Sequence, residues 1–333
     1  MVLSANSGPS GGGPVVVTGA GGFIGRALIA HFRDSARPFR AVVRGQESAK
    51  HLAPGAIVVR DLATATEAEL DAVVAGTSAI VHLAARVHVM EDTSNDPASA
   101  FRVANALATT RLAQAAIRAH VARFIFMSTV KVNGESTKPG RPFHPDDPPA
   151  PRDAYARSKL EAERELLRLA AGSTLDPVIL RLPLVYGPGV VGNFLALEDE
   201  IARGHALPLG AIRNRRSVLG VGNLVEAIDA ALDVPVAPRG VHFIADGESV
   251  SVPELTRAIA ASLGIDARLI RIPVPLLRLA GFLSGRRAMI DRLTRSLEVD
   301  PASFMAATGW RPRHSLAHGL VATARWWRLR HSI

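Results

Sequence analysis

The sequence predicts an α/β protein with a doubly wound parallel sheet and a smaller C-terminal α/β lobe. In the first half of its 333 residues, short apolar runs alternate with stretches of helical spacing. Strands that alternate with helices form parallel sheets covered on both faces. The first apolar run also leads into a glycine-rich turn and an amphipathic stretch from Ile24 to about Arg33, a typical start for a nucleotide-binding fold.

The remaining elements follow in order along the chain. Strands are expected at Val15–Thr18, Ala41–Arg44, Ile57–Val59, Ala79–Ala84, Phe124–Ser128 and Val178–Leu182, with helices at Glu67–Ala75, Ala98–His120 and Ala154–Ala171. Beyond Pro183 the pattern loosens. A strand edge and helix are expected over 219–232, a strand after Gly240, and helices at Pro253–Leu263 and Ser315–Arg330. The apolar segment Val274–Leu283 fits either a core or an interface.

This pattern divides the chain into a tail and two lobes. Residues 1–13 are expected to be a disordered tail, because they are rich in Gly and Ser. Residues 14–185 form the nucleotide-binding domain, to which 212–235 returns. Residues 186–211 and 236–333 form the substrate-binding lobe.

Composition narrows the function classes. With 48% hydrophobic and 21% charged residues, the chain resembles an ordinary globular enzyme, and its lack of cysteine excludes disulfides and thiolate metal sites. It shows no secretion signal and no uninterrupted apolar stretch of membrane-spanning length, so a cytoplasmic protein without stable membrane insertion is expected. The net charge of +9 comes from scattered arginines with few aromatic residues, which favours small anionic substrates over nucleic acid. No metal is expected, and a homodimer is left open.

The first strand leads directly into a glycine fingerprint. Gly19, Gly22 and Gly25 follow Val15–Thr18 and open the first helix. Such glycines permit a tight turn, close approach of a pyrophosphate and close packing of helix on strand. The helix N-terminus adds free N–H groups for the anion. The pattern therefore predicts a Rossmann-type dinucleotide site.

Arg44 bears on the choice of coenzyme. It lies nineteen residues past Gly25, at the end of the second apolar run. A carboxylate there would bind the ribose hydroxyls of NAD, whereas a cation suits a 2′-phosphate and favours NADP(H). A solvent-exposed arginine at a strand end explains the residue nearly as well. Asp61 and Leu62 follow the third strand, where they could contact the adenine edge.

Tyr155 and Lys159 are candidates for proton transfer. Their i, i+4 spacing places them on one face of a helix. A tyrosine with a pKa near 10 is a poor base at neutral pH, but a neighbouring ammonium would lower that pKa and favour the phenolate. Ser128 and Thr129 end the fifth strand, so their hydroxyls either orient a substrate oxygen or cap the next turn.

Together these residues resemble the extended short-chain dehydrogenase/reductase family, which includes nucleotide-sugar epimerases, dehydratases and reductases. The resemblance runs from about Val15 to Trp327. It rests on the motifs Gly19-x-x-Gly22-x-x-Gly25, His82-Leu83-Ala84-Ala85, Tyr155-x-x-x-Lys159 and Arg181-x-Pro183-x-x-Tyr186-Gly187-Pro188.

Position along the chain, the motifs and the resemblance together predict three sets of site residues. The catalytic set is Thr129, Tyr155 and Lys159, with Ser128 beside them. The cofactor set is Gly19, Gly22, Phe23, Ile24, Gly25, Arg44, Asp61, Leu62, Leu83, Ala84, Ala85, Tyr155, Lys159 and Pro183. The substrate set, for a UDP-sugar, is Arg86, Lys131, Asn193, Arg216 and, with a weaker case, Arg292.

Departures from the family pattern narrow the reaction. The 4,6-dehydratases carry an Asp-Glu pair after the catalytic threonine, where this chain has Val130 and Lys131. Dehydration is therefore not expected. The epimerases usually read Val-Tyr-Gly where this chain has Val132-Asn133-Gly134. The segments HLAARVHVM, KVNGE, GVVGNF and NRRS are more similar to a bacterial 4-reductase subgroup that makes UDP-N-acetylquinovosamine for surface polysaccharide.

Three functions stay open at this point. The first is NAD(P)H-dependent reduction of the C4 ketone of a UDP-4-keto-6-deoxy-N-acetylhexosamine. The second is UDP-hexose 4-epimerisation, which reuses a tightly bound NAD. The third is a non-catalytic role, which is disfavoured because both Tyr155 and Lys159 are present. Lys131 would bind the acyl group of the sugar, tune Tyr155 or simply face solvent.

Overall fold

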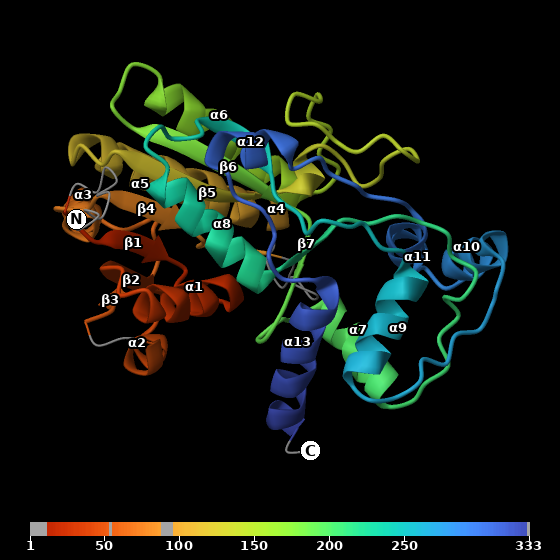
Figure 1. Ribbon diagram of the computed structural model, residues 1–333. Coiled ribbons are helices and arrows are strands. Elements are labelled where there is room, and N and C mark those ends of the chain that lie inside the picture. Colours follow the sequence, from red (N-terminus) through yellow and green to blue (C-terminus); the bar gives the residue numbers. More distant parts are fainter. Residues whose placement is uncertain (1–11, 53–54, 88–95, 332–333) are drawn as a thin grey trace, which may run out of the picture.

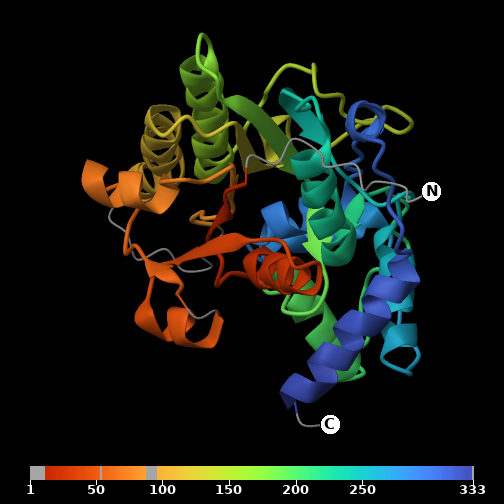
Figure 2. The same ribbon diagram turned by 60° about the vertical axis from the view of Figure 1, so that its left-hand side comes forward.

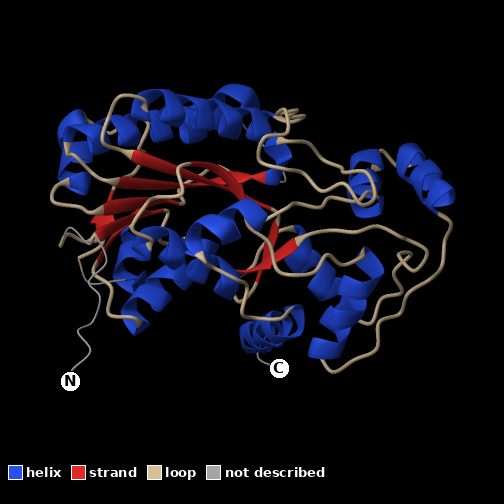
Figure 3. Ribbon diagram, turned by 45° about the horizontal axis from the view of Figure 1, so that its top comes forward, coloured by secondary structure: helices blue, strands red, loops and turns tan. Residues whose placement is uncertain are grey.

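The computed structural model, which describes residues 12–52, 55–87 and 96–331, confirms the doubly wound α/β fold. Seven parallel strands form one sheet in the order β3-β2-β1-β4-β5-β6-β9. They are β1 (Val15–Thr18), β2 (Phe39–Val43), β3 (Ile57–Val58), β4 (Ala79–His82), β5 (Arg123–Thr129), β6 (Asp176–Leu182) and β9 (Gly240–Phe243). Helices lie above and below this sheet (Figure 3).

Alternating side chains of the strands supply two separate cores. In β1, Val15 and Val17 face one core while Val16 faces the other. Because successive side chains of a strand point to opposite faces, each strand is anchored on both sides. The covering helices are α1 (Phe23–Asp34), α2 (Gln46–Leu52), α3 (Glu67–Val74), α5 (Ala108–Arg118), α6 (Ala154–Ala170), α8 (Val221–Asp233) and α12 (Ala302–Thr308).

The long helix expected at 98–120 is present but not regular. It begins as α4 (Pro97–Phe101), continues as a π-helix over Arg102–Leu107 and ends as α5. A π-helical turn inserts an extra residue and is frequent at functional sites. Here it holds Asn105 inward, with only 1% of the side chain exposed. The periodicity alone did not predict this irregularity.

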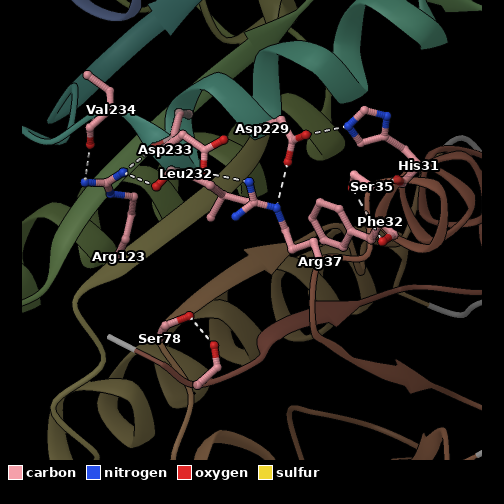
Figure 4. Close-up of polar contacts among 12 residues, drawn as sticks. His31, Phe32, Ser35, Arg37, Ser78, Arg123, Asp229, Leu232, Asp233 and Val234 are labelled. Atoms are coloured by element: carbon pink, nitrogen blue, oxygen red, sulfur yellow. Dashed lines mark hydrogen bonds and ion pairs between the residues drawn. The ribbon is translucent and has the colours of Figure 1, made fainter. Parts of the chain in front are cut away.

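Helix α8 comes from the second half of the chain yet packs on α1. Figure 4 shows Asp229 of α8 pointing at His31 and Arg37, which lie on and just after α1. Arg123, at the start of β5, donates to the carbonyl oxygens of Ala231, Leu232 and Val234 at the end of α8. A cation at a helix C-terminus satisfies its last carbonyls and its dipole.

The rest of the chain lies beside the carboxyl edge of the sheet (Figures 1 and 2). It contains the parallel pair β7 (Leu184–Tyr186) and β8 (Val218–Gly220), with α7 (Asn193–Ala202), α9 (Val252–Ser262), α10 (Val274–Leu283), α11 (Arg287–Thr294) and α13 (Leu316–His331). Its core gathers α7, α9 and α13 around Tyr186 and Trp327. In the part of the chain that the structure describes, no helix combines the length and apolar character needed to cross a bilayer.

Several elements differ from the sequence-based expectation. Strand β2 begins at Phe39 rather than Ala41, and β3 has only two residues. Strand β7 was not expected, since three residues after Pro183 carry little signal and pair only with the distant β8. The division into lobes stays a prediction.

Candidate active site

The turn between β1 and α1 brings backbone close to backbone. Gly19 has a φ of +67°, and a Cβ there would lie 2.6 Å from the Ala84 nitrogen after β4. A Cβ on Gly25 would lie 2.3 Å from the Gly19 oxygen. Both positions therefore exclude larger side chains. Gly22 caps α1 without a side-chain hydrogen bond, which leaves the helix N-terminus to an anion.

A cavity of about 1070 Å³ opens at this turn. It lies between the ends of β1 and β4, where the strand order reverses and ligands of open α/β sheets bind. Its lining includes these residues of the predicted cofactor and substrate sets: Gly19, Gly22, Arg44, Asp61, Leu62, Leu83, Ala84, Ala85 and Arg86. The volume and the glycine cradle fit an extended dinucleotide.

Other predicted cofactor residues, Tyr155 and Lys159 of α6 among them, lie outside this lining. Ile24 packs into the core beneath α1, and Phe23 packs against the core of the smaller lobe. Gly25 allows α1 to approach β1. Pro183 is buried between β6 and β7.

Two arginines line the cavity where β2 and β3 end, on the side of β1 away from β4. Arg44 follows β2 and Arg60 follows β3, and both are exposed. Asp61 directly follows Arg60 in the sequence. Its carboxylate accepts a hydrogen bond from the Ala63 nitrogen at 2.8 Å and so caps its own turn. Sequence reasoning missed Arg60 because a lone arginine at a strand end carries no pattern.

Helix α6 carries the candidate proton-transfer pair. Asp153 caps it by accepting from the Ala156 nitrogen at 2.7 Å, which fixes the first turn where Tyr155 lies. The Tyr155 ring centroid is 6.1 Å from that of Phe101. Lys159, one turn on, is 2% exposed, with its Nζ 4.0 Å from the ring centroid of Phe126.

The electrostatics of this pair correct one expectation. Burial raises the pKa of Tyr155, and the negative charge of Asp153 raises it further. Burial also lowers the pKa of Lys159 to about 7. The i, i+4 spacing predicts that the Lys159 ammonium favours the phenolate, but in this structure desolvation of Tyr155 prevails. Burial and the charge of Asp153 therefore both favour the neutral phenol of Tyr155 over the phenolate.

A buried ion pair lies behind α6. Glu163 is 1% exposed and pairs with Arg181 of β6, with its Oε2 2.6 Å from Nη2 and its Oε1 3.0 Å from Nε. Arg181 also donates to Asn133 at 2.8 Å. Ser128 donates to the same Glu163 carboxylate, so its hydroxyl is engaged with α6. Glu163 continues the i, i+4 series of Tyr155 and Lys159, a signal that could have revealed it.

The inward Asn105 connects three segments around the cavity. Its Oδ1 accepts from the Arg86 nitrogen at 2.7 Å, and its Nδ2 donates to the Ser158 hydroxyl at 2.9 Å. Ser158 in turn donates to the Tyr155 carbonyl at 2.7 Å. The Arg86 guanidinium lies 5.4 Å from the Phe101 ring centroid. This network ties the cavity wall to the start of α6.

Thr129 is the last residue of β5, and Lys131 lies in the short 3-10 helix Val130–Val132 that follows it. Thr129 is 9% exposed, and its Oγ1 accepts from the Lys131 nitrogen at 3.3 Å. The Lys131 ammonium is 2.7 Å from the Asp153 carboxylate, which joins this turn to the cap of α6. The structure thus brings the segment of Thr129 to that of Tyr155.

The other predicted substrate residues lie in the smaller lobe. Arg216 donates to the carbonyl oxygens of Arg292 and Arg295, so the two predicted arginines are brought together. The charge of Arg292 and burial both lower the pKa of Arg216, with burial the larger cause. Asn193 is exposed at the start of α7. The resembling segment HLAARVHVM lies partly outside the described residues.

A glycine-cradled cavity at the switch point of a parallel sheet, with a Tyr-x-x-x-Lys pair on a helix that Asn105 links to the cavity wall, is the arrangement of a class of dinucleotide-binding α/β enzymes. Comparison with known families identifies the family within this class. The sequence profile of the "NAD dependent epimerase/dehydratase family" matches residues 15–244. The chain therefore belongs to this family.

Individual relatives cover nearly the whole chain. A "UDP-glucose 4-epimerase" of Vibrio cholerae is 38% identical over 93% of this chain and 94% of its own. An "N-acetyl-alpha-D-glucosaminyl-diphospho-ditrans,octacis-undecaprenol 4-epimerase" of Escherichia coli O157:H7 is 28% identical, with 94% of both chains covered. The structure of "MoeE5 in complex with UDP-glucuronic acid and NAD" is 28% identical with a TM-score of 0.74, over 96% of this chain and all of the other.

Proposed function

We propose that this protein reduces the C4 ketone of a UDP-4-keto-6-deoxy-N-acetylhexosamine with NAD(P)H, forming UDP-N-acetylquinovosamine for surface polysaccharide. The observation that carries this proposal is that Tyr155 and the buried Lys159 lie one turn apart on α6, and burial and Asp153 favour the neutral phenol of Tyr155. Ketone reduction needs a proton donor at the new alkoxide, and a neutral phenol is ready for that role.

Each residue of the site would have its own role in the reduction. The nicotinamide, when bound, supplies the hydride that adds to C4. The carbonyl electron pair moves to oxygen, and Tyr155 gives its phenolic proton to that oxygen. Thr129 orients the oxygen by hydrogen bonding, and Lys159 holds positive charge near the resulting phenolate. The Glu163–Arg181 pair and Asn105 keep α6 in place.

Other residues of the cavity and of the smaller lobe are assigned to the coenzyme and the substrate. Gly19, Gly22 and the N-terminus of α1 would hold the pyrophosphate. Arg44 and Arg60 favour the 2′-phosphate of NADP(H), since they are the arginines that line the cavity where β2 and β3 end. Arg216 and Arg292 would attract the diphosphate of the UDP-sugar, a substrate type supported by the UDP-sugars bound to MoeE5.

Dehydration is not part of this proposal. Elimination of water from the sugar needs an additional acid and base after Thr129, where this chain has Val130 and Lys131. Val130 is buried, and Lys131 is paired with Asp153. Neither supplies a carboxyl group to the reaction.

A second candidate is UDP-hexose 4-epimerisation, favoured by the 38% identity to the Vibrio cholerae relative. An epimerase must first remove a proton from the C4 hydroxyl, which needs a phenolate at position 155. It then returns the hydride, so it consumes no external coenzyme.

One experiment separates the two functions. Purified protein is incubated with UDP-4-keto-6-deoxy-N-acetylglucosamine and either NADPH or NADH, and the loss of coenzyme absorbance is followed. The proposal expects stoichiometric oxidation, faster with NADPH. Nicotinamide that survives dialysis, together with UDP-galactose turnover and no net coenzyme use, would establish the epimerase instead.

A further inference from the structure

Helix α10 has apolar side chains on two opposite faces. Leu277 and Gly281 face inward, and a Cβ on Gly281 would lie 2.6 Å from Ile290 of α11. The other face is exposed. Its members are Leu276 (55% exposed), Leu279 (54%), Phe282 (63%) and Leu283 (77%).

The exposed residues form one continuous stripe. At about 100° per residue, Leu276, Leu279, Phe282 and Leu283 lie within an arc of about 120°. Met289 of α11 is also 42% exposed. A contiguous stripe of large exposed apolar side chains marks an interaction surface. We call this stripe the α10 face.

Positive charge surrounds the α10 face. Residues 265–295 contain seven arginines, two aspartates, and no lysine or glutamate, so this short segment carries much of the net charge of +9. Arg271 and Arg286 are exposed at the two ends of α10. An apolar stripe bordered by arginines matches an anionic bilayer, where the apolar side chains enter the acyl boundary and the guanidinium groups meet headgroup phosphates.

A small cavity lies beside the α10 face and is lined by several of these arginines. Leu279 and Phe282 line a cavity of about 340 Å³ together with Arg278, Arg287, Asp291 and Arg295. Arg278, Arg287 and Arg295 lie 3.6, 4.0 and 3.3 Å from the single Asp291 carboxylate. Three cations thus share one anion beside two exposed apolar side chains. The excess positive charge fits a lipid phosphate.

We propose that the α10–α11 hairpin docks this protein on the surface of an anionic lipid bilayer. The ten residues of α10 span about 15 Å, half a hydrocarbon core, so the helix lies in the interface rather than across it. A second copy of the chain is a poorer partner, because a symmetric contact would oppose two arginine-rich segments. Figure 1 shows α10 at the outer edge of the molecule, away from the sheet.

Co-sedimentation with vesicles tests this proposal. The full chain should bind phosphatidylcholine vesicles containing phosphatidylglycerol, bind pure phosphatidylcholine weakly, and be released by salt. Leu279→Ser with Phe282→Ser should weaken binding about tenfold or more, because two apolar anchors are removed. Arg271→Glu with Arg286→Glu should abolish the preference for anionic vesicles. Phe282→Trp should shift its fluorescence to the blue on anionic vesicles.

The matched control lies on α13. Val321 (59% exposed) and Leu329 (75%) are equally apolar but distant in sequence, so Val321→Ser with Leu329→Ser should leave vesicle binding unchanged. Circular dichroism and thermal unfolding check that all variants stay folded. Failure of the full chain to bind anionic vesicles, or equal binding by the α10 variant, would overturn the proposal. So would a lipid-free dimer that dissociates in the Leu279→Ser, Phe282→Ser variant, because a second copy would then cover the α10 face.

Discussion

The region around α6 buries charged side chains, whereas the α10–α11 hairpin exposes large apolar side chains. Around α6, Lys159, Glu163 and Arg181 are at most 3% exposed and hydrogen-bonded or packed on rings. On α10 the large apolar side chains face outward, and the neighbouring arginines share one carboxylate.

This difference separates two physical tasks. Buried paired charges cannot rearrange without a large desolvation cost, so they hold a reacting group in one place. An exposed apolar helix gains free energy only when something covers it. We therefore expect the α6 region to serve chemistry and the α10–α11 hairpin to serve contact with a partner.

Removing the phenolic hydroxyl should have the largest effect. Tyr155→Phe should lower kcat about 10²–10⁴-fold, because a positioned proton donor is lost. Steady-state assays with the 4-keto sugar measure this. The other tyrosine provides the control: Tyr186 donates to Asp246 at 2.9 Å, so Tyr186→Phe should lower stability but preserve most activity. Full activity in Tyr155→Phe would show that another group protonates the product.

Breaking the buried ion pair should have the next largest effect. Glu163→Ala leaves Arg181 buried without its bidentate partner and should lower the free energy of unfolding by about 3–5 kcal/mol. Glu161→Ala, on the same helix, removes an exposed pair with Arg102 and should cost about 0–1 kcal/mol. Urea unfolding compares the two. Equal losses would mean that α6 is not held by its buried charges.

Replacing Arg44 in the coenzyme site should have a smaller effect on activity. Arg44→Asp should lower kcat/KM for NADPH about tenfold or more and favour NADH, because a cation suited to the 2′-phosphate becomes a carboxylate suited to ribose hydroxyls. Arg203→Asp, an exposed arginine at the end of α7, is the control and should leave the coenzyme ratio unchanged. An unchanged ratio in Arg44→Asp would mean that Arg44 does not contact the coenzyme.

The sequence revealed the parts of the site that depend on local spacing. The glycine fingerprint predicted the cradle because Gly25 meets Gly19 within the same turn, although the approach of Gly19 to Ala84 depends on the neighbouring strand β4. The Tyr155–Lys159 spacing predicted a shared helix face. Other parts depend on distant partners. Arg181 meets Glu163 only because β6 lies next to β5, which α6 covers, and the inward turn of Asn105 needs a π-helix.

The sign of the Tyr155 pKa shift also depends on the fold. The i, i+4 spacing places the Lys159 ammonium one helical turn from Tyr155, and that charge alone predicts a lowered pKa. Burial and Asp153 reverse that sign, and neither quantity can be read from spacing. The exposed α10 face is a similar case, because an apolar run predicts a core equally well.

The ionisation of Tyr155 should show the subtlest effect. In a Tyr186→Phe background Tyr155 is the sole tyrosine, and its tyrosinate absorbance can be titrated directly. An ordinary tyrosine is about half ionised at pH 10. Because burial and Asp153 favour the neutral phenol, Tyr155 should be less than half ionised there. Asp153→Asn still caps α6 but removes the charge, so ionisation should move to lower pH.

The control for this titration is Glu165→Gln, which removes a carboxylate that pairs with Arg168 on the exposed side of α6. It should leave the titration of Tyr155 in place, since solvent screens that charge. If Tyr155 is ionised at neutral pH, or if Asp153→Asn does not move its titration, the phenol is not the resting state. The α6 region would then suit a base rather than an acid, and epimerisation would become the better assignment.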